Sequence, residues 1–515
     1  MKKVVASTLT ATLVLTFISF FNKGIAFFRE VLYAKNFGLG DEFNAYLVSS
    51  ILPITIYSII YYISQFYFVP SYNKIVSENR SEEKKFLSDN FWLFFYIGCI
   101  ITLVLFFFSE ELMNFYLSNV DIQIKELSLK IFRVFIFTIP LSAAHSILAA
   151  YLNAEYKFTY PAVSIVILNI TVVIGLVTLV EKFDIFVIPF AIVLGMLFQL
   201  LFLLFKCRKK INFNPLSILR ADSFSNVFNT TLLLTLLAEL ITFSYMLVDR
   251  YFLDRLGEGG VASLSYAYQV FELPIKIFTF AIATIIFSKF SKSFHTMPGE
   301  ELERQFKVGI KLAIFIFTPI ALIYLFWGNA VIKILYERGR FAESDTVLTF
   351  DMLKIYAGSI VFYSAYAIIN KMIYSARLLK NLVFISLLAA IVKICLAFLL
   401  IDNYQQEGLA FSTSAAYAIL CIAGFIVVIK ALNFNSYFYA VKDSFIYLGI
   451  GGVCFLLTNL ISEYLIISNQ VNSIINPLIF FVLYLLTVIY LDTKEVTWLK
   501  EIVKTALSNL KSNEA

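Results

Sequence analysis

Two basic side chains, Lys23 and Arg29, lie inside the first apolar segment of the chain, where together they could bind an anion. They are six residues apart, which places them roughly 120° apart around a helix and about 9 Å apart along its axis. A charged side chain at membrane depth costs about 2.5–3.5 kcal/mol, so it usually faces a protein interior or water. Two interpretations are open. Both cations contact one ligand across a wide cavity or bent helix, or each extends to the outer headgroups.

Further polar side chains at membrane depth lie in the second half of the chain. Asp249, Asn370 and Lys393 all fall inside apolar segments. A buried charge must be paired, so a structural pair between Asp249 and a lysine is one interpretation. The other is a cation or proton site that couples transport to a conformational change.

Motifs for metal or nucleotide chemistry are missing from the sequence. The two histidines, His145 and His295, are far apart and have no neighbouring cysteine or acidic ligand pattern, so we expect no metal site. No GxxxxGK[ST] motif occurs, which argues against ATP binding in the P-loop manner. We therefore expect no cofactor, and coupling to a sodium ion or a proton stays open.

The composition is that of a membrane protein. Of the 515 residues, 60% are hydrophobic and 15% are charged, and the mean hydropathy is +0.83. Soluble domains are roughly half apolar and one quarter charged. Apolar runs of about 20 residues, enough to cross a bilayer, recur along nearly the whole chain. These runs predict an all-α polytopic membrane protein with about fourteen transmembrane helices, near 4–34, 45–69, 91–108, 129–152, 158–180, 184–206, 229–251, 262–288, 308–328, 350–376, 380–401, 408–432, 441–465 and 475–491.

The basic residues predict the orientation in the membrane. Lysine and arginine concentrate in both termini and in the loops after even-numbered spans, as in the run Lys206 to Lys210. By the positive-inside rule, both termini face the cytoplasm of a bacterial inner membrane. This bias also accounts for the net charge of +6 without a nucleic-acid partner. No loop has room for a soluble catalytic domain, so we do not expect an enzyme.

An internal repeat predicts the architecture. Three landmarks of the first two spans recur 221 positions later, in the seventh and eighth spans: Arg29, Gly38 and Pro53 match Arg250, Gly259 and Pro274. Because six spans separate the copies, both halves enter the membrane in the same direction, as in parallel-repeat transporters. We predict two six-helix lobes around a central cavity, followed by two further helices. The expected domains are an N-terminal lobe at 1–215, a C-terminal lobe at 216–435, two extra transmembrane helices at 436–492 and an amphipathic cytoplasmic tail at 493–515.

Several motifs resemble one known family. They are GIAFFRE at Gly24–Glu30, the LNAEYKFTYPAVSIVILN run with Asn153, Pro161 and Asn169, SLSYAYQVFELP at Ser263–Pro274, the RGRF run at Arg338–Phe341 with Asp345, Thr349 and Tyr356, and Gly408 to Ala410 with Thr413 and Ser414. Together they resemble the MurJ/MviN lipid II flippases of the multidrug, oligosaccharidyl-lipid and polysaccharide exporter superfamily. The resemblance extends over nearly all twelve core spans.

The resemblance implies a V-shaped body that flips a polyprenyl-pyrophosphate-linked saccharide from the inner to the outer leaflet. Lys23 and Arg29 match two cavity arginines of the family, and Glu30 stands where the family has Asp. Arginine and lysine are natural partners of phosphate groups, so these two are the expected pyrophosphate ligands. Asn44 replaces an aspartate of the outer helix, and we expect it, with Glu30, to line the cavity or its gate.

Other positions depart from the family pattern. Tyr57 and Ser58 replace an Arg-Arg pair, and Gln269 stands where the eighth helix carries an arginine, so Gln269 is the third expected substrate contact. Asp249 matches an acid that contributes to a sodium site in some members. Lys393 lies near the helix of that site, where its ammonium group would stand in place of the ion. With Asn370, these form the expected coupling or ion site.

Three functions are compatible with the sequence. The first is a flippase for lipid II or a related surface-polysaccharide unit, with membrane lipids and cell-envelope synthesis proteins as partners. The second is a cation-coupled exporter of small molecules from the same superfamily, which would need acids in the N-terminal lobe. The third is a membrane scaffold that does not transport. Lys23 and Arg29 favour the flippase.

Overall fold

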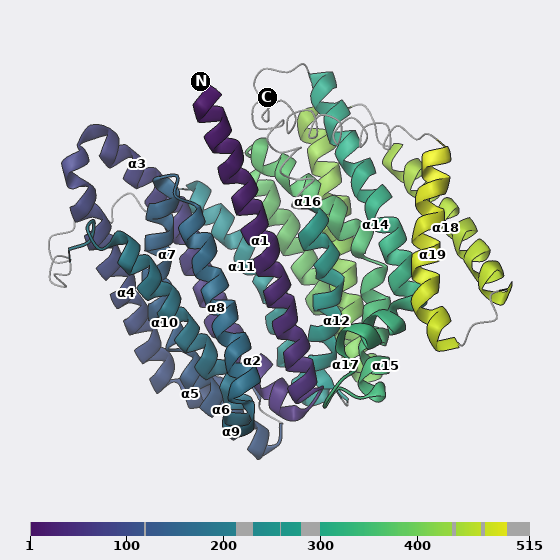
Figure 1. The fold of residues 1–515 in the computed structure, drawn as a ribbon, viewed down its shortest axis with the longest axis horizontal. Coiled ribbons are helices and arrows are strands. Elements are labelled where there is room, and N and C mark those ends of the chain that lie inside the picture. The colour runs from purple at the N-terminus through teal and green to yellow at the C-terminus, as the bar shows by residue number, and fades with distance from the viewer. Residues whose placement is uncertain are drawn as a thin grey trace. The chain divides into compact units, whose positions relative to one another are not determined.

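The computed structural model describes residues 2–117, 120–212, 230–257, 259–279, 299–434, 439–464 and 469–491. Every regular element within these ranges is a helix, as the sequence predicts (Figure 1). Eight of the described helices are long and apolar enough to cross a membrane, and nine if two helices bent by 50° count as one span. The total of about fourteen spans stays a prediction, and the expected tail at 493–515 lies outside the described residues.

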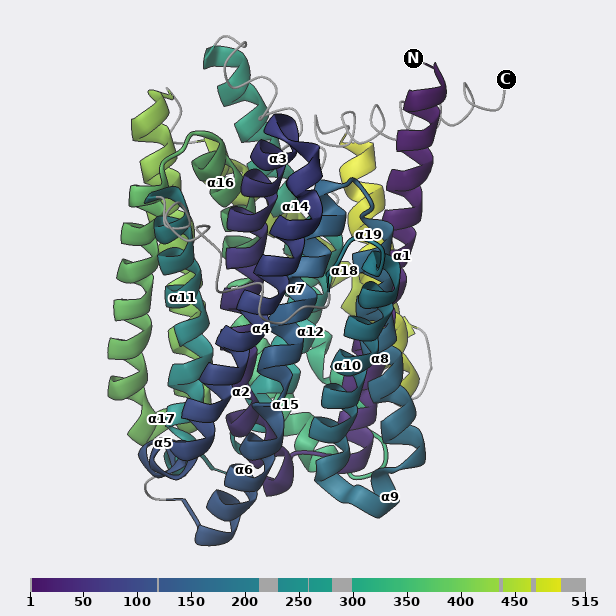
Figure 2. The ribbon, with the colours of Figure 1, turned by 90° about the vertical axis from the view of Figure 1, so that its left-hand side faces the viewer.

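The first compact unit comprises Met1–Ala262 and Arg338–Ala342. Helices α8 and α10 run side by side in two perpendicular views (Figures 1 and 2). Helix α1 packs on α8, and α11 packs on α2. The helices of this unit are α1 (Lys2–Phe37), α2 (Asp41–Ile63), α3 (Val69–Glu78), α4 (Glu83–Phe107), α5 (Ser109–Tyr116), α6 (Ile122–Phe135), α7 (Thr138–Ala154), α8 (Thr159–Thr178), α9 (Val180–Phe183), α10 (Val187–Cys207), α11 (Thr230–Tyr251) and the start of α12 (Gly260–Pro274).

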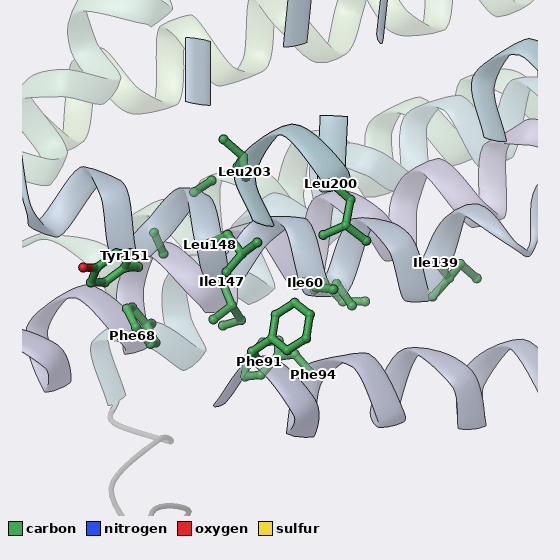
Figure 3. Packing of buried hydrophobic residues seen from close by; sticks show 14 of the residues in the cluster. Ile60, Phe68, Phe91, Phe94, Ile139, Ile147, Leu148, Tyr151, Leu200 and Leu203 are labelled. Atoms are coloured by element: carbon green, nitrogen blue, oxygen red, sulfur yellow. The ribbon is translucent and has the colours of Figure 1, made fainter. Parts of the chain in front are cut away.

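Helix α7 forms the centre of the first unit. Its side chains Ile147 and Leu148 are fully buried and pack with Leu203 of α10 (Figure 3). Gly98 of α4 lies so close to α7 that a Cβ there would come within 2.7 Å of the Cα of Pro140. Small residues permit such close crossings, and van der Waals packing then holds the helices together inside a membrane.

The second compact unit comprises Ser263–Glu337 and Glu343–Ala515. Within it, α16 packs on α17, and α14 packs on α15, α16 and α18. Its helices are the rest of α12, α14 (Gly299–Tyr336), α15 (Glu343–Ala357), α16 (Ile360–Ser375), α17 (Leu379–Leu432), α18 (Tyr439–Tyr464) and α19 (Asn469–Tyr490). The unit boundary at Ala262 differs from the predicted lobe boundary at 215/216, and the lobe division stays a prediction.

Two predicted spans are not single continuous helices. The span at 129–152 breaks between α6 and α7 at Ile136 and Phe137. Pro140 explains the break, since it has no N–H to donate to the carbonyl of Ile136 four residues earlier. That carbonyl accepts instead from the backbone N–H of Ile139 and from the hydroxyl of Thr102 on α4, both at 3.1 Å. The span at 350–376 is likewise two helices, α15 and α16, bent by 50° after Ala357, where glycine and serine disfavour helix.

Helix α17 contains both of the spans predicted at 380–401 and 408–432. Its 54 residues would extend about 80 Å as one straight helix, far more than a bilayer requires. The chain reverses at Gln405, whose φ of 41° and ψ of −124° are not helical. The break falls in the predicted gap between the two spans, so α17 is a pair of helical arms.

Two glycines of the predicted repeat adopt the same unusual backbone. Gly38 has a φ of 56° and Gly259 a φ of 77°. Glycine populates this left-handed region without the steric penalty of a Cβ. The shared conformation gives a local reason for a glycine at both copies of the turn. This local similarity is consistent with the predicted parallel repeat, which stays a prediction.

The RGRF run joins the first unit by packing on the turn after α1. The backbone N–H of Arg340 donates to the carbonyl of Lys35 at 2.8 Å, and its guanidinium pairs with Glu42 at 3.2 Å. Phe341 is buried. Gly339 has a φ of 64°, and a Cβ at this position would clash with the same Lys35 carbonyl. The run therefore requires glycine at its second position.

Replacing Gly339 with alanine should destabilise the protein. The left-handed backbone costs a residue with a Cβ about 1–2 kcal/mol, and the clash with Lys35 adds to it. We expect a lower midpoint of thermal unfolding for the purified Gly339→Ala variant. Gly452→Ala is the control, because nothing lies within 4 Å of a Cβ there. Equal midpoints for the two variants would contradict the packing described for the RGRF run.

Candidate functional site

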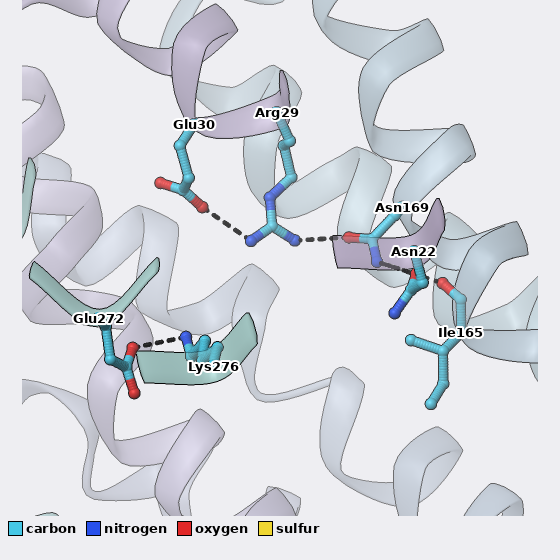
Figure 4. Close-up of polar contacts among 7 residues, drawn as sticks. All are labelled: Asn22, Arg29, Glu30, Ile165, Asn169, Glu272 and Lys276. Carbon is cyan, nitrogen blue, oxygen red and sulfur yellow. Dashed lines mark hydrogen bonds and ion pairs between the residues drawn. The ribbon is translucent and has the colours of Figure 1, made fainter. Parts of the chain in front are cut away.

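The Arg29 guanidinium is the centre of a polar cluster in the first unit (Figure 4). Its Nη2 pairs with Glu30 Oε1 at 2.8 Å, and its Nη1 donates to Asn169 Oδ1 at 2.9 Å. The Asn169 amide donates in turn to Asn22 Oδ1 at 2.8 Å. Residues of α1 and α8 thus hold the guanidinium from two sides. We call Asn22, Arg29, Glu30 and Asn169 the Arg29 cluster.

The Arg29 cluster is buried but not closed. The side chain of Arg29 is 24% exposed and that of Glu30 is 10% exposed. The guanidinium carbon also lies 5.6 Å from the ring centroid of Tyr33, a favourable cation–π distance. Its Nε is buried and has no hydrogen-bond partner in the described part of the chain. The guanidinium is therefore fixed in place while keeping donor capacity for a ligand with several acceptor oxygens.

Arg29 and Glu30 are the two predicted residues that the structure brings together. Lys23, the other expected cation, is half-buried on the same helix, about 9 Å further along its axis. Sequence reasoning did not place Asn22 and Asn169 in the site. The available signal was an amide inside an apolar helix, since Asn169 is only 4% exposed, and buried polar groups require hydrogen-bond partners.

Asn44 lies on α2, and its side chain contacts the start of α12. Its Oδ1 accepts a hydrogen bond from the backbone N–H of Ala262 at 2.8 Å, and its Nδ2 donates to the carbonyl of Leu39 at 3.5 Å. The first N–H groups of a helix have no partner within the helix, and an asparagine side chain commonly supplies one. The observed role of Asn44 is thus to cap α12, and its predicted role in a gate stays a prediction.

The end of α11 contributes a buried arginine next to the predicted acid Asp249. Arg250 is 9% exposed, and its Nε donates to the backbone carbonyl of Leu47 on α2 at 2.8 Å. A guanidinium that binds a neighbouring carbonyl satisfies its charge inside the membrane and joins the two helices. Asp249 itself is half-buried.

The remaining predicted residues fall in the second unit. Gln269 on α12 and Asn370 on α16 are both half-buried, and the Asn370 Oδ1 has no hydrogen-bond partner among the described residues. Lys393 on α17 is fully buried and donates to Thr413 Oγ1 at 2.5 Å. Near Gln269, the side chain of Lys276 pairs with Glu272 at 2.5 Å, one helical turn away (Figure 4).

We next consider the remaining titratable and metal-ligating side chains in the part of the chain that the structure describes. No group of three or more histidine, cysteine, aspartate or glutamate side chains there could hold a metal ion. His145 is buried, and its Nε2 lies 2.9 Å from Ser164 Oγ. Arg133 at the end of α6 pairs with Glu110 at 3.0 Å. The Arg29 cluster is thus the arrangement best suited to an anion.

This fold is shared with solved polytopic membrane proteins. A solved structure titled "Lipid II flippase MurJ, inward closed conformation" aligns with a TM-score of 0.79 and 23% identity, and it covers 93% of this chain and 98% of its own. An inward-facing multidrug transporter of the MATE family aligns with a TM-score of 0.66 and 15% identity, covering 82% of this chain and 99% of its own. At these identities the likeness shows the fold alone.

The family follows from the sequence match. A family model described as "Lipid II flippase MurJ" matches residues 33–475, so the chain belongs to the MurJ family. "Probable lipid II flippase MurJ" of Borreliella burgdorferi is 25% identical over 335 residues, 64% of this chain and 65% of that protein. The Aquifex aeolicus relative is 26% identical over 60% of each chain. In both of these alignments, this chain covers less than two thirds of the relative's own length. "Lipid II flippase MurJ" of Thermosipho africanus is 25% identical over 93% of this chain and 96% of its own.

The capping role of Asn44 can be separated from a role in a gate. Asn44→Ala removes the acceptor for the Ala262 N–H and should lower the stability by about 1 kcal/mol. Asn44→Asp keeps an acceptor and should stay close to the parent protein. Thermal unfolding of the three purified proteins measures this. An alanine variant that unfolds like the parent but loses transport would instead point to a gate.

Proposed function

We propose that this chain moves a polyprenyl-pyrophosphate-linked saccharide, either lipid II or a related surface-polysaccharide unit, from the cytoplasmic to the outer leaflet by alternating access. Membership of the MurJ family and the names of the relatives support this proposal. The protein would work in the bacterial inner membrane with both termini in the cytoplasm. Its partners would be the lipid-linked saccharide, the surrounding lipids and cell-envelope synthesis proteins, and it would transport without catalysing a reaction.

The Arg29 cluster is the observation that carries this proposal. A pyrophosphate presents several anionic oxygens, and a planar guanidinium can bind two of them at once. Arg29 is held by Asn169 at 2.9 Å and remains 24% exposed. Because the group is already ordered, little conformational entropy is lost when a ligand binds.

Glu30 suggests how binding and release alternate. Its carboxylate occupies Nη2 of Arg29, one of the donors that a pyrophosphate would use. The incoming anion would replace the carboxylate at Nη2, while Asn169 keeps its hydrogen bond to Nη1. When the cavity opens outward, Glu30 can return to Arg29 and displace the ligand. The guanidinium then never remains unpaired in a low-dielectric site, where an isolated charge is costly.

The polar groups further along the chain would couple this cycle to an energy source. Asp249 in the first unit and Asn370 in the second are each proposed as a coupling residue, because a half-buried carboxylate and a buried amide oxygen are both suitable cation ligands. The ion, sodium or proton, would bind in only one state of the cycle.

Substituting Arg29 tests the proposed substrate contact. Arg29→Ala removes charge-assisted hydrogen bonds worth about 1.5–3 kcal/mol each, so transport should fall about 10- to 100-fold or more. Arg29→Lys keeps the charge but loses the bidentate geometry and should retain partial activity. Arg304→Ala is the control, because Arg304 is 68% exposed and pairs only with Glu301 among the contacts observed for it. Full transport by a folded Arg29→Ala variant would refute the assignment.

The function itself is tested by complementation. The host's lipid II flippase is depleted, this chain is expressed, and both survival and lipid II in the outer leaflet are scored by a periplasmic labelling assay. Rescue of both would support lipid II as a substrate. Failure by well-folded protein would exclude lipid II, and loss of a surface polysaccharide in a deletion strain would then identify another lipid-linked saccharide. Failure of both assays would favour the cation-coupled exporter.

A further inference from the structure

Lys393 is buried more completely than any other charged residue in the described ranges. Its exposed fraction is 0%, and it lies in the first arm of α17, an apolar membrane-spanning helix. Lysines near helix ends usually extend their ammonium group to the membrane surface. With no exposed surface Lys393 cannot do so, and a charge in this position is costly unless protein groups bind it. The ammonium group therefore has a site built for it inside the second unit.

The site presents a hydroxyl oxygen to the ammonium group. Lys393 Nζ lies 2.5 Å from Thr413 Oγ1, and that hydroxyl lies 3.1 Å from the carbonyl oxygen of Leu409. A hydroxyl has one proton and two lone pairs. Because its proton is donated to Leu409, Thr413 can only accept from Lys393. An oxygen fixed in this orientation offers its lone pair, as it would to a metal cation.

The break in α17 creates this arrangement. Lys393 lies 12 residues before Gln405 and Thr413 lies 8 residues after it, which corresponds to about 18 Å and about 12 Å along the two arms. The difference of about 6 Å is within reach of the four-carbon stem of a lysine. Ala389 and Ala397, both fully buried, flank Lys393 on its own arm and leave room for the stem.

We propose that the ammonium group of Lys393 is a built-in cation: it occupies an oxygen site between the two arms of α17 of the kind that binds a monovalent metal ion in other transporters. The second unit would then need no dissolved sodium at this position. The claim that the ammonium group occupies a cation site rests only on the contacts of Lys393. The claim that transport depends on this group rests on the proposed function.

The test replaces Lys393 and offers cations from solution. Purified protein is unfolded thermally in sodium chloride or in choline chloride at equal ionic strength. The unfolding temperature of the parent protein should depend less on sodium than that of Lys393→Ala. Lys393→Ala should unfold about 5 °C lower in choline chloride. Sodium or n-propylammonium, which matches the deleted atoms, should restore much of the loss, whereas tetramethylammonium, which has no N–H donor, should not.

Two further variants keep the test decisive. Lys393→Met fills the same volume without a charge, so it should fold, show no rescue by cations and transport at least tenfold more slowly. Lys371→Ala, on α16, removes an exposed lysine of the same unit and should show no dependence on the cation.

Three results would overturn the proposal: a folded Lys393→Ala protein that depends on sodium no more than the parent does, a folded Lys393→Ala protein that neither sodium nor n-propylammonium rescues, or normal transport by Lys393→Met. If the protein moves no lipid-linked saccharide at all, the unfolding measurements still test whether the ammonium group of Lys393 occupies a cation site. Failure of the proposed function is thus distinguishable from failure of this inference.

Discussion

The structure depends on one constraint: a charge inside hydrocarbon must find its partners within the protein. Three cations meet it in three ways. Arg29 uses a carboxylate and an amide, Arg250 uses a backbone carbonyl of a neighbouring helix, and Lys393 uses a hydroxyl across a helix break. Each solution fixes the position of at least one helix. These polar contacts therefore help to fix which helices pack together, while the apolar residues supply most of the buried core.

Helix breaks belong to the same constraint, because each break releases backbone groups that need new partners. The hydroxyl of Thr102 donates to the carbonyl of Ile136, to which Pro140 has no N–H to donate. The reversal at Gln405 lies on the exposed side of the chain, where water can satisfy the freed groups. It also brings Thr413 back alongside Lys393. An irregular position thus provides polar chemistry that two separate straight helices would not position so closely.

The sequence predicts those features of this protein that depend on residues close together in the chain. Hydropathy locates the long apolar helices of the described residues, and it separates the two arms of α17 because the residues between them are polar. Arg29 and Glu30 are neighbours in the chain, so their pairing is easy to anticipate. Asn169 lies 140 residues from Arg29, and the Ala262 N–H that Asn44 caps lies 218 residues away. Such contacts depend on which helices are neighbours in the fold. The spacing of residues along a single helix does not predict this.

Under the proposed function, the neutral and paired side chains at several predicted contact positions have a mechanistic consequence. Gln269 is neutral, Lys276 is paired with Glu272, and Tyr57 and Ser58 carry no charge. A carrier must bind its substrate firmly enough to collect it and weakly enough to release it. A few cations, one of which already shares its donors with Glu30, would bind a pyrophosphate less tightly than a row of free arginines. Weak binding of the headgroup suits a lipid-linked substrate, because the lipid tail stays in the bilayer and keeps the effective concentration of the headgroup high.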